Sequence, residues 1–185
     1  MPGILEDADA KLSGAVRLLL AQLKLELDHL DMRIDEADAV IKKTARENEA
    51  CRRLVAIPGI GPVTATALIA AIGNGGAFHK GREFAAWMGV VPREHSTGGQ
   101  QKLLGISKRG NSYLRRLFVQ GARAVLQQRT KQSSGLSAWL AQLISRTHRN
   151  VAAVALANKL ARIAWAVLAK NERYRPSVVA EVAAA

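Results

Sequence analysis

The feature that most constrains this fold is a long run of regularly spaced apolar residues in the first third of the chain. Their spacings alternate between four and three, at Val16, Leu20, Leu23, Leu27, Leu30, Ile34, Ala37 and Ile41. This heptad seam predicts one long helix, and no proline interrupts the chain between Leu12 and Glu49. The seam is longer than a small domain can cover. We therefore expect a coiled coil with another chain or with a returning helix, the alternative being one amphipathic helix packed on its own domain.

Composition supports helices in the rest of the chain as well. Hydrophobic residues make up 49% of the sequence, which is enough to bury a core, but aromatic residues make up only 4%. Such a core must consist of Ala, Leu, Val and Ile, which favours packed helices over a β-sandwich. The fold class that we predict is all-α. Cys51 is the single cysteine, so no disulfide can form within the chain, and a reducing, cytoplasmic setting is the simplest expectation.

The sequence pattern divides into three parts. We predict a coiled-coil helix over residues 1–50, a helical domain over 51–175 and a disordered tail over 176–185. Within the domain, a helix should end before Pro58 and a new one should run from Pro62 to about Ile72. Further helices are expected over residues 81–88, 114–129, 136–146 and 151–170, with a polar linker over 130–135 and a loop, able to hold a small hairpin, over 89–111.

Charge separates the first part from the remainder. Residues 1–50 carry a net charge of −4, whereas residues 51–185 carry +16. A block this basic attracts polyanions, and nucleic acid is the commonest polyanion inside cells. A membrane partner is not expected, because the cations do not lie on one amphipathic helix and the apolar stretch of residues 151–168 contains Lys159 and Arg162.

The segment Ile57-Pro58-Gly59-Ile60-Gly61-Pro62 has the spacing of a helix-hairpin-helix turn. Glycines allow close approach of a phosphate, and the free N–H groups at the start of the next helix point toward it. We predict DNA-backbone contacts at Gly59, Gly61 and Thr64. The alternative is an ordinary corner between two helices, with glycines needed only for its geometry.

A second candidate site lies in the glycine-rich stretch that follows. Ser96 precedes Thr97, Gly98 and Gly99 in a basic loop, which suits a hydroxyl nucleophile attacking phosphorus. The alternative is a simple turn. The predicted phosphate contacts are Arg93, Gly98, Gly99, Lys102, Lys108, Arg109, Asn111, Arg115 and Arg116.

Taken together, these motifs resemble a known family. Ile57 to Pro62, Phe84 to Pro92, Ser96 to Gly99 and Ile106 to Asn111 follow one another as in the C-terminal domain of insertion-sequence transposases related to the Piv and MooV DNA invertases. The resemblance covers about 70 residues, and the preceding coiled coil fits it. It implies a recombinase that joins to a DNA 5′ phosphate through serine, in many members guided by an RNA of the element.

Carried to this chain, the resemblance makes Ser96 the catalytic nucleophile. Thr97 is one residue nearer to the glycines, so the register between Ser96 and Thr97 stays open. His95 is a weaker candidate for a base, because neighbouring side chains often diverge.

One departure from the family pattern concerns metal. Members of the family also carry a RuvC-like domain with four acidic metal ligands, but after residue 50 this sequence has only Glu83, Glu94, Glu172 and Glu181, with no two spaced as a metal pair. We therefore expect no metal site and no cofactor in this chain, with Mg²⁺ held by a separate RuvC-like domain. The chain would be a transposase part inactive by itself, with DNA, a guide RNA and either copies of itself or full-length transposase as partners. The alternative function is a non-catalytic DNA-binding module that regulates intact transposase.

Other candidates for chemistry are weak. His29, His79 and His148 are each isolated from another histidine and from Cys51 in the sequence, so a histidine metal site is not expected. Trp87, Trp139 and Trp165 occupy apolar helical positions, which are more typical of a core than of base stacking.

Overall fold

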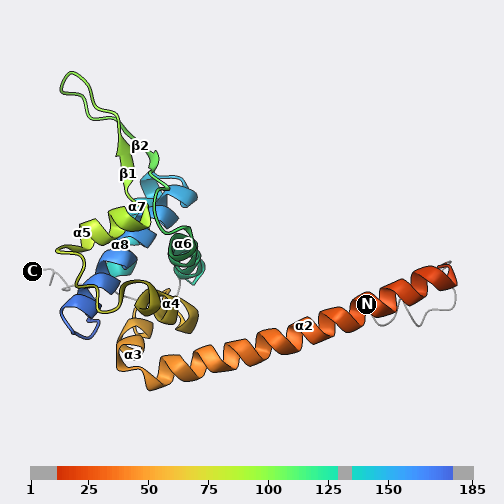
Figure 1. Ribbon diagram of the computed structural model, residues 1–185. Coiled ribbons are helices and arrows are strands. Elements are labelled where there is room, and N and C mark those ends of the chain that lie inside the picture. The colour runs from red at the N-terminus through yellow and green to blue at the C-terminus, as the bar shows by residue number, and fades with distance from the viewer. Residues whose placement is uncertain (1–11, 129–134, 177–185) are drawn as a thin grey trace, which may run out of the picture. The chain divides into compact units, whose positions relative to one another are not determined.

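A computed structural model describes residues 12–128 and 135–176 of the chain. Those residues form seven helices and one two-stranded sheet, which confirms the all-α prediction (Figure 1). The chain divides into two compact units, Met1–Lys43 and Thr44–Ala185, which we describe separately. Residues 177–185 of the predicted tail and residues 130–134 of the predicted linker lie outside the described residues.

Helix α2, Gly14–Glu47, is the long helix expected from the heptad seam. Its 34 residues extend over about 51 Å, at the usual rise of an α-helix. The seam is open to solvent along most of this length, with Leu23 49%, Leu27 54% and Ile34 60% exposed. The helix itself is confirmed, whereas its pairing in a coiled coil stays a prediction.

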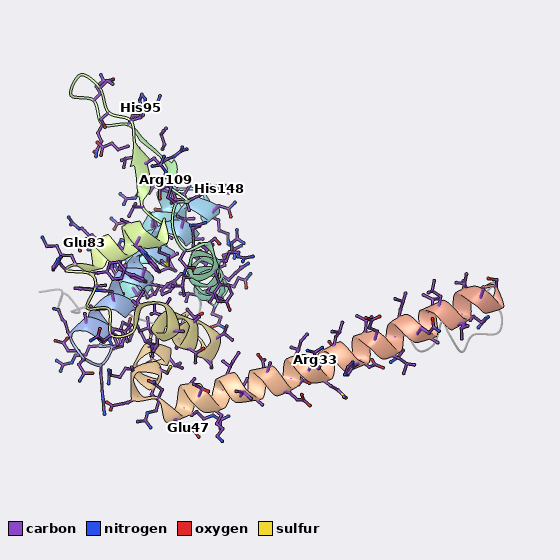
Figure 2. All side chains as sticks on the ribbon, viewed as in Figure 1. Arg33, Glu47, Glu83, His95, Arg109 and His148 are labelled. Carbon is purple, nitrogen blue, oxygen red and sulfur yellow. The ribbon has the colours of Figure 1, made fainter. Side chains whose placement is uncertain are left out.

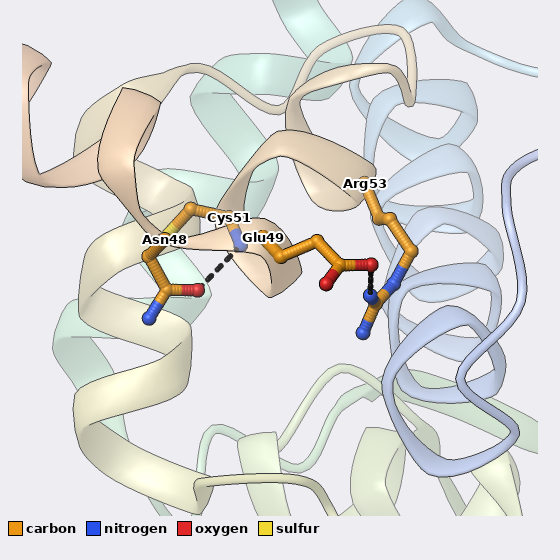
Figure 3. Close-up of polar contacts among 4 residues, drawn as sticks. All are labelled: Asn48, Glu49, Cys51 and Arg53. Carbon is orange, nitrogen blue, oxygen red and sulfur yellow. Dashed lines mark hydrogen bonds and ion pairs between the residues drawn. The ribbon is translucent and has the colours of Figure 1, made fainter.

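Helix α3, Glu49–Val55, begins after a break at Asn48 (Figure 3). Asn48 has an extended backbone, and its side-chain oxygen accepts a hydrogen bond from Cys51 N at 3.1 Å. Such an N-cap starts a new helix because it satisfies one of the free N–H groups of the first turn. Arg53 pairs with Glu49 one turn earlier at 2.8 Å. Cys51 is buried, and burial raises the pKa of its thiol, so the lone cysteine is a core residue.

A tight turn joins α3 to α4, Pro62–Ile72. Ile57 and Ile60 are buried and anchor the turn, and Ala65 is buried on α4. Gly59 has φ +82°, and a Cβ there would lie 2.7 Å from the carbonyl oxygen of Gly121. A Cβ on Gly121 would in turn overlap the carbonyl oxygen of Gly59. The turn and α6, Ser112–Gln127, therefore meet backbone to backbone, which requires glycine on both sides.

This contact predicts a large loss of stability for Gly121→Ala. The added methyl must displace backbone rather than a flexible side chain, so we expect the free energy of unfolding to fall by about 3 kcal/mol. Urea denaturation measures the change. Gly105→Ala is the matched control, because a Cβ at Gly105 has open space and should change the free energy little. Equal stability of the two variants would contradict the close contact.

The core of the second unit is built around α8, Arg149–Ala169, which contacts α3, α5, α6 and α7. The other helices are α5, Gly81–Met88, α6, Ser112–Gln127, and α7, Gly135–Arg146. Alanines at the contact faces of α8 let these helices approach closely. The helices expected after Pro58 are present, with ends within one or two residues of those predicted. By length and composition α8 could cross a membrane, and half of its apolar window is buried in the core of this unit.

The tryptophans only partly follow the prediction of core positions. Trp87 is 37% exposed at the edge of an aromatic cluster with Phe78 and Phe84. Trp165 is half-buried and donates a hydrogen bond from Nε1 to the Gly75 carbonyl at 3.1 Å. Trp139 is half-buried beneath Lys159, whose Nζ lies 4.1 Å from the ring centroid.

The small hairpin expected in the glycine-rich stretch is present. Strand β1, Pro92–Glu94, pairs antiparallel with β2, Leu103–Ile106, and the hairpin extends away from the helices of its unit (Figure 1). Its residues are exposed apart from the half-buried Ile106. The hairpin contributes almost nothing to the core.

Candidate nucleic-acid interface

The turn before α4 offers backbone groups rather than side chains. Gly61 is exposed, and a Cβ there would have open space, so its surface is free for close approach. Thr64 is only 6% exposed, so a contact from this residue would have to come from its N–H in the first turn of α4. Gly59 is a glycine because of its contact with α6. The phosphate contacts expected at these three residues stay predictions. Backbone groups would have to make them.

Glycines 98 and 99 form the tip of the hairpin. Both have positive φ, +59° and +77°, and Gln100 N donates to the Thr97 carbonyl at 3.1 Å to close the turn. Two successive positive φ values are typical of the tight turns that suit twisted strands. The turn geometry explains the glycines, and the open space around both also leaves room for a phosphate.

Ser96 lies on the arm just before that tip. Its hydroxyl donates a hydrogen bond to Oε1 of Glu94 at 2.6 Å and accepts one from Lys102 N at 3.3 Å. The side chain is exposed. A hydroxyl bonded to a carboxylate has a proton acceptor in place, which is the arrangement of a nucleophile with a general base.

The sequence analysis did not identify Glu94 as the hydrogen-bond partner of Ser96. The available signal was its spacing: residues two apart on an extended strand face the same side. His95, the expected weaker candidate for a base, stands between them and uses its backbone N–H to bond the Lys102 carbonyl at 2.9 Å. Figure 2 shows His95 on the hairpin.

At the base of the hairpin, the chain packs against the end of α5. Gly110 has φ +98°, and a Cβ there would overlap the Trp87 carbonyl oxygen, while a Cβ on Gly89 would overlap the Arg109 carbonyl oxygen. Lys108 adopts a positive φ of 56° and donates its N–H to the Gly89 carbonyl at 3.1 Å. These backbone contacts fix the segment, and the side chains of Lys108 and Arg109 are exposed.

Two of the predicted phosphate contacts hold the fold together. Asn111 is the N-cap of α6, and its side-chain oxygen accepts from Leu114 N at 3.0 Å. Arg115 is half-buried and donates to the Met88 carbonyl at 3.1 Å, so it ties α6 to the end of α5. Their contact with nucleic acid stays a prediction beside these structural roles.

The cap at Asn111 gives a measurable prediction. Asn111→Ala leaves an N–H in the first turn of α6 without its acceptor, and we expect the free energy of unfolding to fall by about 1 kcal/mol. Thermal or urea denaturation measures the loss. Asn111→Asp keeps an acceptor at the cap and should retain most of the stability, so an equal loss in both variants would argue against capping.

A basic groove runs beside the first part of α6 and has a volume of about 250 Å³. Its lining residues are Ile106, Lys108, Arg115, Arg116, Val119, Gln120, Arg123 and Val154. Four of them are cationic and none is acidic. The structure thus brings together the predicted residues Lys108, Arg115 and Arg116 and adds Arg123, which sequence reasoning missed. Because Arg123 follows Arg116 by seven residues, helical periodicity places both on one face of α6.

The groove and the hairpin arm that contains Ser96 are continuous along the chain. Ile106 ends β2 and lines the groove, and Lys108 follows two residues later. Arg93 on β1 and Lys102 just before β2 are exposed on the arm itself. The predicted cations therefore follow the hairpin from its arm to its base.

The described residues do not form a metal site. Within residues 12–128 and 135–176, no group of three or more His, Cys, Asp or Glu side chains lies together. Glu83 is on α5, where its carboxylate accepts from His79 N at 2.8 Å, whereas His95 is on the hairpin (Figure 2). His148 is the N-cap of α8. The residues present do not fit the two-metal site of a RuvC-like domain.

The part of the chain that matches a known family includes the turn before α4, the hairpin and all four cations of the groove. Residues 51–138 match the transposase IS116/IS110/IS902 family. This match confirms the resemblance to insertion-sequence transposases. The relation to the Piv and MooV invertases and the serine chemistry stay predictions.

Individual transposases are similar over most of this chain. "Probable family 20 transposase" of Pseudomonas aeruginosa is 48% identical over 167 residues, which cover 90% of this chain and 49% of that protein. The transposase for insertion sequence element IS1111A of Coxiella burnetii is 42% identical over 175 residues, which cover 95% of this chain and 48% of that protein. A shorter match, 37% identical over 59 residues, joins 32% of this chain to 18% of the pilin gene-inverting protein of Moraxella bovis. The chain spans about half the length of the first two transposases.

Proposed function

We propose that this chain is the DNA-binding, serine-bearing C-terminal part of a DNA transposase, acting in DNA transposition by recombination. The observation that carries the proposal is the hydrogen bond of 2.6 Å between the Ser96 hydroxyl and the Glu94 carboxylate, on an exposed arm that leads into a basic groove. The similarity to transposases over 90% of the chain supports it.

DNA would be held at two places on the second unit. The turn between α3 and α4 acts as a helix-hairpin-helix, in which N–H groups around Gly61 bind a phosphate. Lys108, Arg116 and Arg123 bind further phosphates in the groove, where no carboxylate opposes them. Contacts of this kind position the backbone and do not read bases.

Ser96 would perform the covalent step. Its oxygen attacks the phosphorus of a DNA strand, the proton passes to the Glu94 carboxylate, and the bond from phosphorus to the 3′ oxygen breaks. The 3′ oxygen leaves and takes a proton from water, so that the 5′ phosphate is joined to Ser96. Arg93 and Lys102 are the exposed cations on the arm that can offset the negative charge of the transition state.

The remaining parts of the reaction would come from outside the described residues. An acidic RuvC-like domain would supply Mg²⁺ chemistry. A guide RNA of the element is a further proposed partner, in keeping with the family resemblance. We place the protein in the cytoplasm, where the DNA of a bacterial cell is found.

Helix α2 would join the chain to its partners. Its heptad seam is exposed over most of the helix, and a coiled coil with a second copy or with full-length transposase would cover it. Apolar side chains in this number are rarely left in water.

The same exposed seam supports a second candidate function. A chain that binds DNA and pairs through α2, but performs no chemistry, would regulate intact transposase by forming mixed oligomers. This module would bind DNA equally well with or without the Ser96 hydroxyl.

One experiment separates the two functions. The full chain is incubated with 3′-labelled linear and branched DNA and Mg²⁺, first alone and then with a RuvC-like domain added, and denaturing gels reveal covalent adducts. An adduct that depends on the added domain and on Ser96 is the result expected for the transposase part. Salt-sensitive binding without any adduct would support the regulatory module.

A further inference from the structure

The second unit contains a larger groove that the proposed function does not use. It has a volume of about 710 Å³, within the range of sites that bind organic ligands. Its lining residues are Lys80, Gly81, Arg82, Trp139, Ala155, Asn158, Lys159, Arg162, Ile163, Trp165, Ala166 and Lys170. None of these residues lines the groove beside α6. The two grooves are separate sites.

Charge in the larger groove has a single sign. Lys80, Arg82, Lys159, Arg162 and Lys170 contribute five cations, and no lining residue is acidic. None of the five forms an ion pair within the described part of the chain. Burial and repulsion by Arg162 both lower the pKa of Lys159. A bound anion would relieve that repulsion, so the site favours a polyanion.

Two indole rings form part of the wall, and one of them is held in place. Trp165 is fixed by the hydrogen bond from Nε1 to the Gly75 carbonyl, and Gly75 and Gly81 lie so close that an added Cβ on either would be 3.2 Å from the ring. Trp139 lies under the Lys159 ammonium at 4.1 Å. A cation therefore lies directly beside an aromatic surface, in a groove that also contains a second, rigid indole.

Cations interleaved with aromatic rings suit one class of polyanion. Phosphates bind the cations, and unpaired bases can stack on indole faces, whereas the bases of a duplex are already stacked on one another. Duplex backbone contacts need no aromatic wall. A phosphate bound at Lys159 would lie beside this aromatic wall.

We propose that this groove, between the start of α5, α7 and α8, binds unpaired nucleotides of a single-stranded nucleic acid. The proposal rests on the proposed function only in taking nucleic acid as the polyanion. Duplex DNA would occupy the α6 groove at the same time, since the two grooves share no residue.

The test compares single-stranded and duplex binding in variants of the full chain. Arg162→Ala combined with Lys170→Ala removes two exposed cations of the larger groove. Arg146→Ala combined with Arg149→Ala removes two exposed cations that line neither groove, and it serves as the control for net charge. Short oligothymidylate and oligouridylate probes distinguish DNA strands from RNA strands, and a blunt duplex reports the α6 groove.

We expect the Arg162/Lys170 variant to bind the single-stranded probes roughly tenfold more weakly, with the salt slope smaller by about 1.4, while duplex affinity falls no more than in the control. Trp139→Phe keeps an apolar ring at this position, and it should reduce the quenching of tryptophan fluorescence by the same probes. If the control variant weakens single-stranded binding as strongly, or the duplex probe loses the same affinity as the single strands, the proposal is wrong. If the wild-type chain does not bind the duplex probe, the proposed function is contradicted instead.

Discussion

Ser96→Ala is expected to abolish the covalent protein–DNA adduct and to leave DNA affinity nearly unchanged. The variant removes one exposed hydroxyl and no cation, so phosphate binding in the α6 groove has no reason to change. The hydroxyl is also peripheral to the core, so folding should be unaffected. Denaturing gels with 3′-labelled DNA and a RuvC-like domain measure the adduct, and a filter or gel-shift titration measures the affinity.

Neighbouring variants make this prediction specific. Glu94→Gln keeps a hydrogen-bonding group 2.6 Å from Ser96 but removes the proton acceptor, so adduct formation should slow by about 10²- to 10⁴-fold. His95→Ala should form the adduct at close to the normal rate. Thr97→Ala settles the register: an adduct that survives Ser96→Ala and is lost in Thr97→Ala would transfer the nucleophile to Thr97 and overturn the role of Glu94.

The second large effect is expected in duplex binding. Arg116→Ala combined with Arg123→Ala removes two exposed cations from one face of α6, and neither side chain supports the core. If each binds one phosphate, the slope of log affinity against log salt should become smaller by about 1.8. The affinity itself should fall by roughly 10- to 100-fold at moderate salt.

Two control measurements accompany the Arg116/Arg123 variant. The Arg146/Arg149 variant has the same net charge and should retain most of the duplex affinity. Circular dichroism and urea denaturation should show unchanged folding in both double variants. An unchanged salt slope in the Arg116/Arg123 variant would show that DNA does not occupy the α6 groove, even if the affinity falls.

Local sequence signals explain why the helices could be predicted. The seam from Val16 to Ile41 requires a long helix because its period matches α-helical geometry, and Pro62 favours a helix start at a position where its missing N–H does no harm. Gly98 and Gly99 predict a turn because they tolerate positive φ. Each of these signals acts over a few neighbouring residues.

Long-range contacts had no such signal. The backbone contact of Gly59 with Gly121 joins residues far apart in the chain, and a single sequence does not reveal which segments meet. The motif alone predicts a phosphate contact at Gly59, and its contact with Gly121 becomes visible only in the packed structure. Arg115 has the composition of a phosphate contact, but its bond to the Met88 carbonyl depends on how α5 and α6 pack.

The candidate site was predicted in part. Ser96 and the cations around it follow from residue types in a glycine-rich loop, whereas the groove lined by Lys108, Arg116 and Arg123 needed the packing of α6 against the hairpin base. The larger groove could not be predicted from the sequence. Trp139 and Trp165 are typical core residues by their positions, and only the packed structure places them among five cations.

The exposure of the β1–β2 hairpin has a consequence for the timing of the chemistry. A two-stranded ribbon without a buried face is marginally stable in water, so the ordering of this arm depends on what it contacts. Part of the free energy of DNA binding would then be used to order the serine rather than to raise affinity. Weaker binding would be exchanged for selectivity, because the Ser96–Glu94 pair would be held firmly only on a strand already seated in the groove.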